Sequence, residues 1–210
     1  MYFGLFSVTA ATVTPRRPTP SRRLSLCLSV CLYGGLLGAL SASSGCASFV
    51  ENFRPVIYGK TAKLFECAAE AGASLGNPAL QPALAAYARH LGAAFQIIDD
   101  VLDYTSSAEV MGKNVGDDLA EGKPTLPLIQ AIKLLPENDA QLIRDAIRTG
   151  GLEHLDRIIA LVRQCGALDY TMARARIESD LALASLAAVP ASPWKQALED
   201  LTRLALARTS

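Results

Sequence analysis

From residue 55 onward, apolar residues recur at spacings of three and four, a pattern typical of amphipathic helices. The pattern predicts a helix over residues 56–73, ended by Gly76, Asn77 and Pro78, and a long helix over residues 79–104. A charged, glycine-rich loop is expected at residues 105–123. Further helices are expected at residues 124–135, 139–148, 152–164, 167–188 and 193–208. Because no segment of useful length alternates with the period of a β-strand, the predicted fold class is all-α.

The first fifty residues lack this helical pattern. They contain four arginines and no Asp, Glu or Lys, and Arg22 and Arg23 precede an apolar run at residues 24–40. This order is typical of an export signal or an organellar transit peptide, and a mis-assigned start of the coding sequence explains it equally well. As a membrane span the run is marginal, since roughly 20 apolar residues are needed to cross a bilayer. We therefore interpret residues 1–50 as a leader outside the fold and residues 51–210 as one partial helical domain.

Charge and cysteine content exclude several classes of function. Four of the 20 basic residues lie in the leader, which leaves 16 basic and 20 acidic residues after it, with no basic stripe for a nucleic acid. The five cysteines form no CxxC pair and the two histidines stand alone, so neither a zinc site nor a disulfide framework is expected. Cys67 and Cys165 are interpreted as buried free thiols, and Trp194 as core or interface packing.

Three carboxylates crowd one turn of the predicted helix 79–104, namely Asp99, Asp100 and Asp103. Like charges at spacings of three and four repel each other, and no Lys or Arg lies within one turn to relieve them. Oxygen ligands without Cys or His favour Mg²⁺ or Mn²⁺, which complete their shells with water and substrate phosphates. The turn therefore predicts a site for a phosphate or diphosphate ester, although an ordinary exposed acidic turn stays open on these residues alone.

Lysines flank this acidic turn in the sequence and strengthen the metal interpretation. Lys60 and Thr61 lie in the helix before it, while Lys113 and Lys123 lie on the glycine-rich loop after it. Ammonium groups and helix N-termini suit an anionic leaving group. Carboxylates for a metal ion and lysines for the remaining oxygens together predict a diphosphate site.

Three motifs make the chain similar to the trans-prenyl (polyprenyl) diphosphate synthase family, and most of all to its octaprenyl-type branch. They resemble the family's lysine–threonine motif, its second aspartate-rich motif and the loop that follows: Lys60-Thr61-Ala62-x-Leu64-Phe65, Gly92-x-x-Phe95-Gln96-x-x-Asp99-Asp100-x-x-Asp103, and Gly112-Lys113-Asn114-x-Gly116-Asp117-Asp118-Leu119-x-Glu121-Gly122-Lys123-Pro124. The resemblance covers about residues 51–208. It implies the C-terminal part of an isoprenoid-synthase-type helical bundle.

The resemblance also implies a role for each residue of the motifs. Asp99 and Asp100 would bind Mg²⁺ and Asp103 would support them, while Asp117 and Asp118 would contact the metal at most indirectly. The allylic diphosphate would contact Lys60, Thr61, Gln96, Lys113 and Lys123, of which Lys60 and Lys113 would act catalytically. In the family reaction the allylic diphosphate ionises, isopentenyl diphosphate attacks the cation, and loss of a proton leaves a chain longer by one isoprene unit.

Part of the family pattern has no counterpart in this sequence. Residues 1–59 contain one acidic residue, Glu51, and nothing that resembles the family's first aspartate-rich motif or the basic residues that hold isopentenyl diphosphate. We therefore expect a truncated polyprenyl diphosphate synthase that is inactive alone, whose remaining helices expose apolar faces. The alternatives are a non-catalytic regulatory subunit of a complete synthase, a membrane-anchored or exported protein defined by its leader, and a terpene cyclase.

The expected partners follow from the same resemblance. They are allylic and isopentenyl diphosphates and a second protein chain, as a homodimer or as a heteromer with a complete synthase, with peripheral membrane contact. The expected location is the cytoplasm, or an organelle or membrane if residues 1–50 form a true targeting segment.

Overall fold

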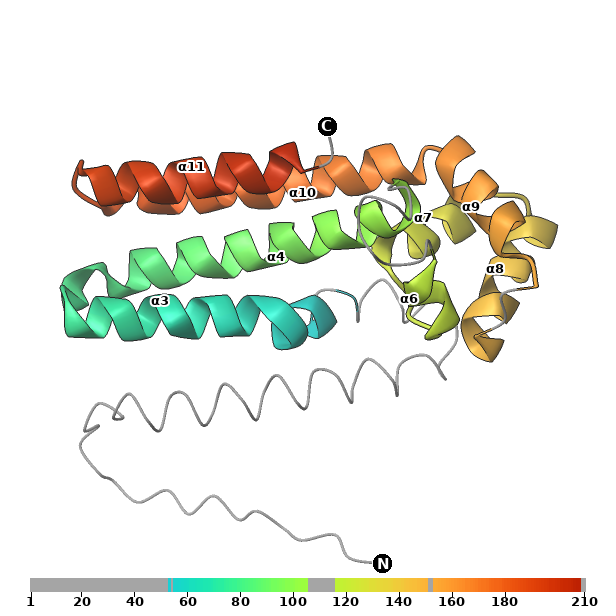
Figure 1. Cartoon of the computed structure of the whole chain (residues 1–210), viewed down its shortest axis with the longest axis horizontal. Helices are drawn as coiled ribbons and strands as arrows, with labels where there is room; N and C mark the ends of the chain where they lie inside the picture. Colours follow the sequence, from blue (N-terminus) through green and yellow to red (C-terminus); the bar gives the residue numbers. More distant parts are fainter. Residues whose placement is uncertain (1–52, 54, 106–115, 151–152, 209–210) are drawn as a thin grey trace, which may run out of the picture.

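The computed structural model describes residue 53 and residues 55–105, 116–150 and 153–208. Within these ranges every regular element is a helix, which confirms the all-α prediction. The longest helix, α4 (Gln81–Thr105), lies between α3 (Lys63–Leu75) on one side and α10 (Ala167–Ser185) with α11 (Pro193–Ala207) on the other (Figure 1). At one end of this bundle lie four short helices, none longer than α3: α6 (Asp117–Ala120), α7 (Leu126–Leu134), α8 (Glu137–Thr149) and α9 (Leu155–Gln164).

Helix α4 is the centre of the bundle because its side chains are buried on nearly every face. From Leu91 to Tyr104 most of its residues are below the surface, including the apolar Ile97, Ile98 and Val101. Small residues such as Ala94 let the neighbouring helices approach closely. Since this part of α4 is buried on most faces, polar residues that it carries, such as Gln96 and Asp100, lie inside the molecule.

The ends of the helices follow their sequence signals. The Ser192 hydroxyl accepts a hydrogen bond from the Lys195 N–H at 3.1 Å, with Pro193 in the first turn of α11. The Asn77 side chain caps the short 3₁₀ helix η2 (Pro78–Leu80) in the same way, and a second 3₁₀ turn, η3 (Leu186–Ala188), follows α10. These boundaries agree with the predicted ones within a few residues.

Two local features depart from the predicted elements. The expected helix over residues 56–73 contains a π-helical turn, η1 (Tyr58–Ala62), before α3 begins. The expected loop over residues 105–123 contains the short helix α6, and residues 106–115 lie outside the described ranges. Neither feature has a periodic signal, because a π turn adds only one residue to a turn and α6 is four residues long.

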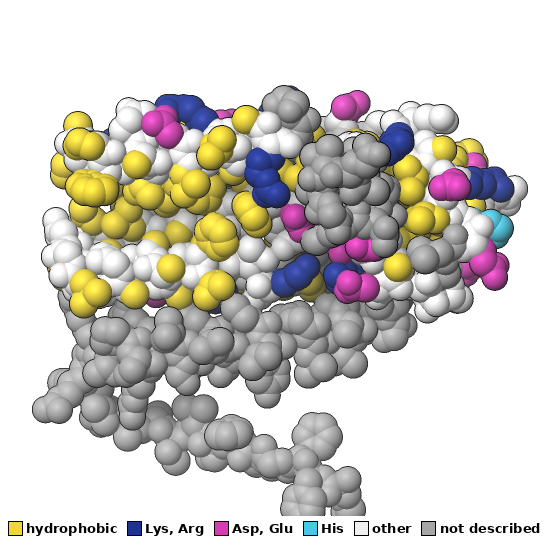
Figure 2. Space-filling view, in the orientation of Figure 1, with side chains coloured by type: hydrophobic (Ala, Val, Ile, Leu, Met, Phe, Trp, Pro, Cys, Tyr) yellow, Lys and Arg dark blue, Asp and Glu magenta, His cyan; other side chains and the backbone are white. Residues whose placement is uncertain are grey.

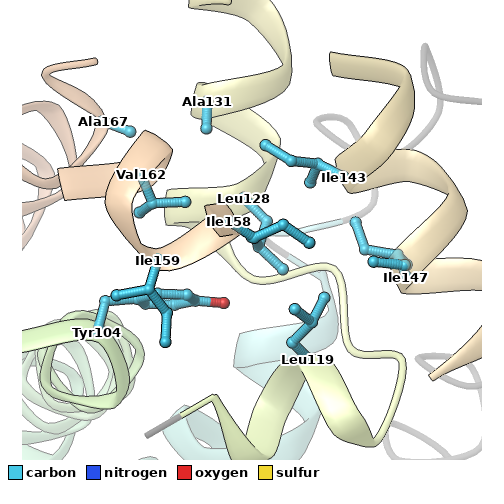
Figure 3. Close-up of a cluster of buried hydrophobic side chains, with 11 residues drawn as sticks. Tyr104, Leu119, Leu128, Ala131, Ile143, Ile147, Ile158, Ile159, Val162 and Ala167 are labelled. Carbon is cyan, nitrogen blue, oxygen red and sulfur yellow. The ribbon is translucent and has the colours of Figure 1, made fainter. Parts of the chain in front are cut away.

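An apolar cluster fills the space between the end of α4 and the four short helices (Figure 3). Its members come from α4, α6, α7, α8, α9 and α10: Tyr104, Leu119, Leu128, Ala131, Ile143, Ala146, Ile147, Ile158, Ile159, Val162 and Ala167. Most of them are completely buried. The cluster therefore fixes α6, and the acidic residues that α6 carries, against the end of α4.

Some side chains depart from the sequence-based interpretation. Cys67 is in a disulfide rather than a free thiol, whereas Cys165 is free. Trp194 is 82% exposed, so it is not part of the core, and its interpretation as interface packing stays a prediction. Other large apolar side chains on α10 and α11 are also exposed, as expected: Tyr170, Ile177, Leu181, Leu201 and Leu204. Among the helices of the described part, none is both long and apolar enough to cross a bilayer.

Candidate functional site

The three predicted metal-binding carboxylates lie in the last turns of α4, where the helix enters the apolar cluster. Asp100 is 3% exposed, and Asp99 and Asp103 are partly buried. Burying a carboxylate is unfavourable unless hydrogen bonds or opposite charges compensate. The neighbours of these three residues therefore decide what the site can bind.

A chain of hydrogen bonds connects Asp100 with the π-helical turn η1. The Thr61 hydroxyl donates to Gln96 Oε1 at 2.7 Å, and Gln96 Nε2 donates to Asp100 Oδ1 at 2.9 Å. Gln96 is itself 5% exposed, so its amide is fixed by both partners. Residues 35 positions apart in the sequence thus meet in one polar network, and its three members were all predicted to belong to the site.

The surroundings of Asp100 and Asp103 favour their neutral forms. Burial raises the pKa of Asp100 to about 7, against the hydrogen bond from Gln96, which lowers it, and the negative charge of Asp118 raises it further. Burial and the charge of Asp118 raise the pKa of Asp103 to about 6. The positive charge of Lys60 lowers the Asp100 pKa but does not outweigh burial. The positive charge near Asp100 therefore does not compensate for its burial.

One carboxylate oxygen in this group has no partner. Asp103 Oδ2 is buried and makes no hydrogen bond, although buried polar atoms almost always have a partner. A divalent cation would satisfy this oxygen and neutralise the crowded charges. The residues present therefore fit a hard cation such as Mg²⁺.

Helix α6 brings a further carboxylate to the site. The N–H of Gly116 donates to the backbone carbonyl of Asp103 at 3.3 Å, and the Asp118 charge acts on both Asp100 and Asp103. Gly116 has a φ of +88°, a left-handed backbone conformation that favours glycine, and a Cβ there would lie 2.4 Å from the Leu155 side chain. The sequence indicates at most an indirect role for Asp118, since a short helix inside a glycine-rich stretch has no pattern that places it.

Two glycines at the other end of α6 fix it against α8. A Cβ on Gly122 would lie 2.8 Å from the Ile147 carbonyl oxygen, and a Cβ on Gly150 would lie 2.7 Å from the Ala120 carbonyl oxygen. At both positions a side chain would meet backbone, which cannot move aside cheaply. The backbones of α6 and α8 therefore approach each other closely.

The predicted lysines are distributed unevenly around the acidic group. Lys60 is exposed beside Thr61. Lys123 Nζ lies 3.0 Å from Asp118 Oδ1 and 2.6 Å from Glu121 Oε2, so this lysine is bound by carboxylates in the structure. Lys113 lies outside the described residues. Figure 2 shows charged side chains gathered over α6 and the start of α3, whereas apolar side chains dominate the same face over α4 and α11.

The carboxylates do not form a closed metal centre. No three His, Cys, Asp or Glu side chains converge to hold a metal ion within the described ranges. Magnesium commonly binds through one or two carboxylates, with water and substrate phosphates completing its shell. The arrangement therefore suits a metal ion that arrives with a phosphate-bearing ligand.

Comparison with known proteins defines the class to which this fold and site belong. The family model described as "Polyprenyl synthetase" matches residues 34–164. The chain belongs to the polyprenyl synthetase family, which confirms the resemblance inferred from the three motifs. The match begins inside the segment interpreted as a leader, so the boundary at residue 50 stays a prediction.

Two of the most similar relatives are named as long-chain synthases. The chain is 53% identical over 154 residues to the all-trans-nonaprenyl-diphosphate synthase (geranyl-diphosphate specific) of Rhodobacter capsulatus, covering 73% of this chain and 47% of that protein. It is 47% identical over 161 residues to the octaprenyl diphosphate synthase of Escherichia coli, covering 75% and 50%. The chain thus spans about half the length of the curated relatives it matches.

Solved structures show the same helical arrangement. A polyprenyl synthase from Caulobacter crescentus, crystallised with calcium and isoprenyl diphosphate, has a TM-score of 0.81 and 37% identity, covering 91% of this chain and 59% of that one. The heptaprenyl diphosphate synthase of Staphylococcus aureus has a TM-score of 0.82 and 26% identity, covering 94% and 62%. The helices described above are therefore part of an isoprenoid-synthase-type bundle.

Proposed function

We propose that this chain supplies the part of a polyprenyl diphosphate synthase site that binds the allylic diphosphate together with a divalent cation. The observation that carries the proposal is the buried network from Thr61 through Gln96 to Asp100, beside the unpartnered Asp103 oxygen. The relatives support it, because they are named as octaprenyl and nonaprenyl diphosphate synthases. The related Caulobacter polyprenyl synthase was crystallised with calcium and isoprenyl diphosphate, that is, with a divalent cation and a diphosphate ester.

Each residue would contribute to holding and releasing the diphosphate. Lys60, Lys113 and Lys123 would donate hydrogen bonds to its oxygens, with Thr61 in contact beside Lys60 while its single hydroxyl hydrogen is donated to Gln96 Oε1. Gln96 would accept the hydrogen bond of the Thr61 hydroxyl and orient Asp100 through its own amide N–H. Fixed cations and donors stabilise a leaving group that gains charge as its bond breaks, and this would favour ionisation of the allylic substrate.

The acidic side chains would hold the metal. Asp99 and Asp100 would bind Mg²⁺, or Mn²⁺, directly or through water, with Asp103 and Asp118 beside them. When bound, the metal ion supplies positive charge to the diphosphate and to the crowded carboxylates. For elongation, a second protein segment that carries an isopentenyl diphosphate site would have to join this half, as in a heteromer with a complete synthase.

Binding measurements test the proposal directly. Isothermal titration of the 210-residue chain with geranyl diphosphate should show binding in MgCl₂ and its loss in excess EDTA. Asp99→Ala should weaken the Mg²⁺-dependent binding by at least about tenfold, whereas Asp180→Ala, on the exposed face of α10, should leave it unchanged. Equal affinities in MgCl₂ and EDTA, or an unaffected Asp99→Ala variant, would disprove the metal assignment.

A chain-elongation assay tests the expected incompleteness. Incubation of this polypeptide alone with geranyl diphosphate, labelled isopentenyl diphosphate and Mg²⁺ should give no longer product. Efficient elongation would show that the first aspartate-rich motif is not required.

A further inference from the structure

The π-helical turn η1 carries two of the proposed diphosphate-binding residues, Lys60 and Thr61. The N–H of Lys63 bonds to the carbonyl of Tyr58, five residues earlier, which defines the π turn. Such turns are rare and intrinsically less favourable than a regular α-helix, so neighbouring contacts must hold this one in place.

A buried glutamate holds the turn from one side. Glu66 is 7% exposed, and its Oε2 accepts a hydrogen bond from the Tyr58 hydroxyl at 2.7 Å. Lys63 Nζ lies 3.4 Å from the same oxygen, and Arg89 of α4 lies 3.8 Å from the other carboxylate oxygen. Burial and the hydrogen bond to Glu66 raise the pKa of Tyr58, so its hydroxyl stays a donor. Glu66 thus joins the start of the turn, the start of α3, and α4.

The Tyr58–Glu66 hydrogen bond is matched to the π turn. Successive residues of a regular α-helix are about 100° apart around the helix axis. Two side chains eight residues apart therefore point in directions about 80° apart. The extra residue of a π turn removes most of this offset and brings the two side chains onto the same face. Conversion of η1 to a regular helix would therefore separate Tyr58 from Glu66.

Helix α4 holds the turn from the other side through a glycine. A Cβ on Gly92 would lie 2.7 Å from the Cα of Ala62 and 3.2 Å from the side chain of Phe65. Ala62 is completely buried at this contact. The backbone of η1 thus rests directly on α4, one turn before Gln96.

We infer that Tyr58, Glu66 and Gly92 are positioning residues for the diphosphate site, an inference that rests on the proposed function for its ligand. By fixing the π turn, they hold the Thr61 hydroxyl 2.7 Å from Gln96, and Gln96 in turn orients Asp100. They also keep Lys60 in the same turn beside these groups. None of the three positioning residues needs to touch the ligand.

The test compares two tyrosines whose hydroxyls bond different parts of the molecule. Tyr58→Phe removes the hydroxyl that bonds Glu66, whereas Tyr87→Phe removes a hydroxyl that donates to the Leu198 carbonyl at 2.8 Å, away from the site. With the full 210-residue chain in MgCl₂, Tyr58→Phe should raise the Kd for geranyl diphosphate about tenfold. Tyr87→Phe should lower Tm and leave Kd within about twofold of wild type.

Conservative variants separate positioning from general stability. Glu66→Gln keeps an oxygen that can accept from Tyr58, so it should retain more affinity than Glu66→Ala. Gly92→Ala displaces the turn from the opposite side and should weaken binding as Tyr58→Phe does. If Glu66→Gln and Glu66→Ala lose affinity equally, the Tyr58 hydrogen bond is not what positions the site.

A measurement without ligand keeps this inference distinct from the proposed function. In ¹⁵N-labelled protein, the side-chain amide signals of Gln96, identified by their loss in Gln96→Glu, report its bonds to Thr61 and Asp100. They should shift in Tyr58→Phe and stay in place in Tyr87→Phe. Unchanged Gln96 signals in Tyr58→Phe overturn the inference. If wild type fails to bind geranyl diphosphate, the proposed function fails, and these signals alone decide the positioning role.

Discussion

Two neighbouring turns of α4 are both buried, yet their surroundings are opposite. Tyr104 is completely buried in the apolar cluster of Figure 3, where its hydroxyl lies 3.4 Å from the Thr125 hydroxyl and its carbonyl accepts from Arg163 Nε at 2.8 Å. Asp100, four residues earlier, is also buried but has a strongly raised pKa. Next to it, an oxygen of Asp103 has no hydrogen-bond partner.

This difference separates a stabilising region from a binding region. The Tyr104 turn is complete without any ligand, because packing fills it and its polar atoms are paired. The Asp100 turn is less favourable as it stands, since the burial of its carboxyl groups outweighs the hydrogen bond from Gln96 and the charge of Lys60. Such local conflicts are expected at functional sites, and the packing around Tyr104 offsets this one.

The largest expected effect is on the stability that the apolar cluster around Tyr104 provides. Leu128 of α7 is completely buried in the apolar cluster, so Leu128→Ala should lower the free energy of unfolding by about 2–5 kcal/mol. Leu134→Ala is the matched control, because it is the same change in the same helix at a residue that is 50% exposed. Urea unfolding followed by circular dichroism measures both. Equal losses would show that the cluster does not carry the stability assigned to it.

An effect of intermediate size is expected from Asp100 and Asp103, on the pH dependence of stability. Asp100 and Asp103 have pKa values of about 7 and about 6 in the folded chain, above the ordinary value of 3.8, so the folded state binds protons more tightly than the unfolded state. The stabilisation that proton binding gives the folded state is complete below pH 3.8 and is lost as pH rises through 6 and 7. The metal-free chain should therefore become less stable between pH 5 and pH 8, by an amount on the order of 2 kcal/mol.

Asp100→Asn sharpens this prediction because it removes one of the two titrating groups. In EDTA at pH 8 the variant should be more stable than wild type, and its stability should depend less on pH. Added MgCl₂ should stabilise wild type and have little effect on the variant. Unfolding midpoints across the pH range provide the measurement, and a steeper pH dependence in Asp100→Asn would contradict the assigned pKa shifts.

The smallest effect is expected at Tyr104 itself. Its hydroxyl makes only a long contact of 3.4 Å, so Tyr104→Phe should cost less than about 1 kcal/mol. The same unfolding experiment measures it. A loss as large as that of Leu128→Ala would show that the hydroxyl, rather than packing, stabilises this turn.

The sequence predicted the helices well where their apolar pattern is long. The segment 79–104 became α4 with an error of two residues at its start and one at its end, because many apolar residues specify one buried helix. The π turn at Tyr58–Ala62 was missed, since the apolar spacing continues through it and its contacts with Glu66 and Gly92 are not visible in the spacing. Those contacts depend on packing between α3 and α4, which a linear pattern does not contain.

The sequence predicted which residues belong to the candidate site better than it predicted the contacts between them. The motifs named Thr61, Gln96 and Asp100, and the structure joins them through hydrogen bonds. The position of Asp118 beside them was not predictable, because it depends on a short helix fixed by distant residues. The roles of these residues, of Lys60, Lys113 and Lys123, and of the metal stay predictions that the binding experiments will decide.

The close contact between α6 and α8 bears on how this site could be transferred to another protein. Gly122 and Gly150 let the two backbones touch, so the place of Asp118 is encoded partly by a residue some thirty positions farther along the chain. Grafting residues 92–123 onto a foreign helical scaffold would carry every acidic residue of the site without the surface that seats α6. The aspartate motif would therefore not bind as a separate segment, and its transfer to another protein would require α8 as well.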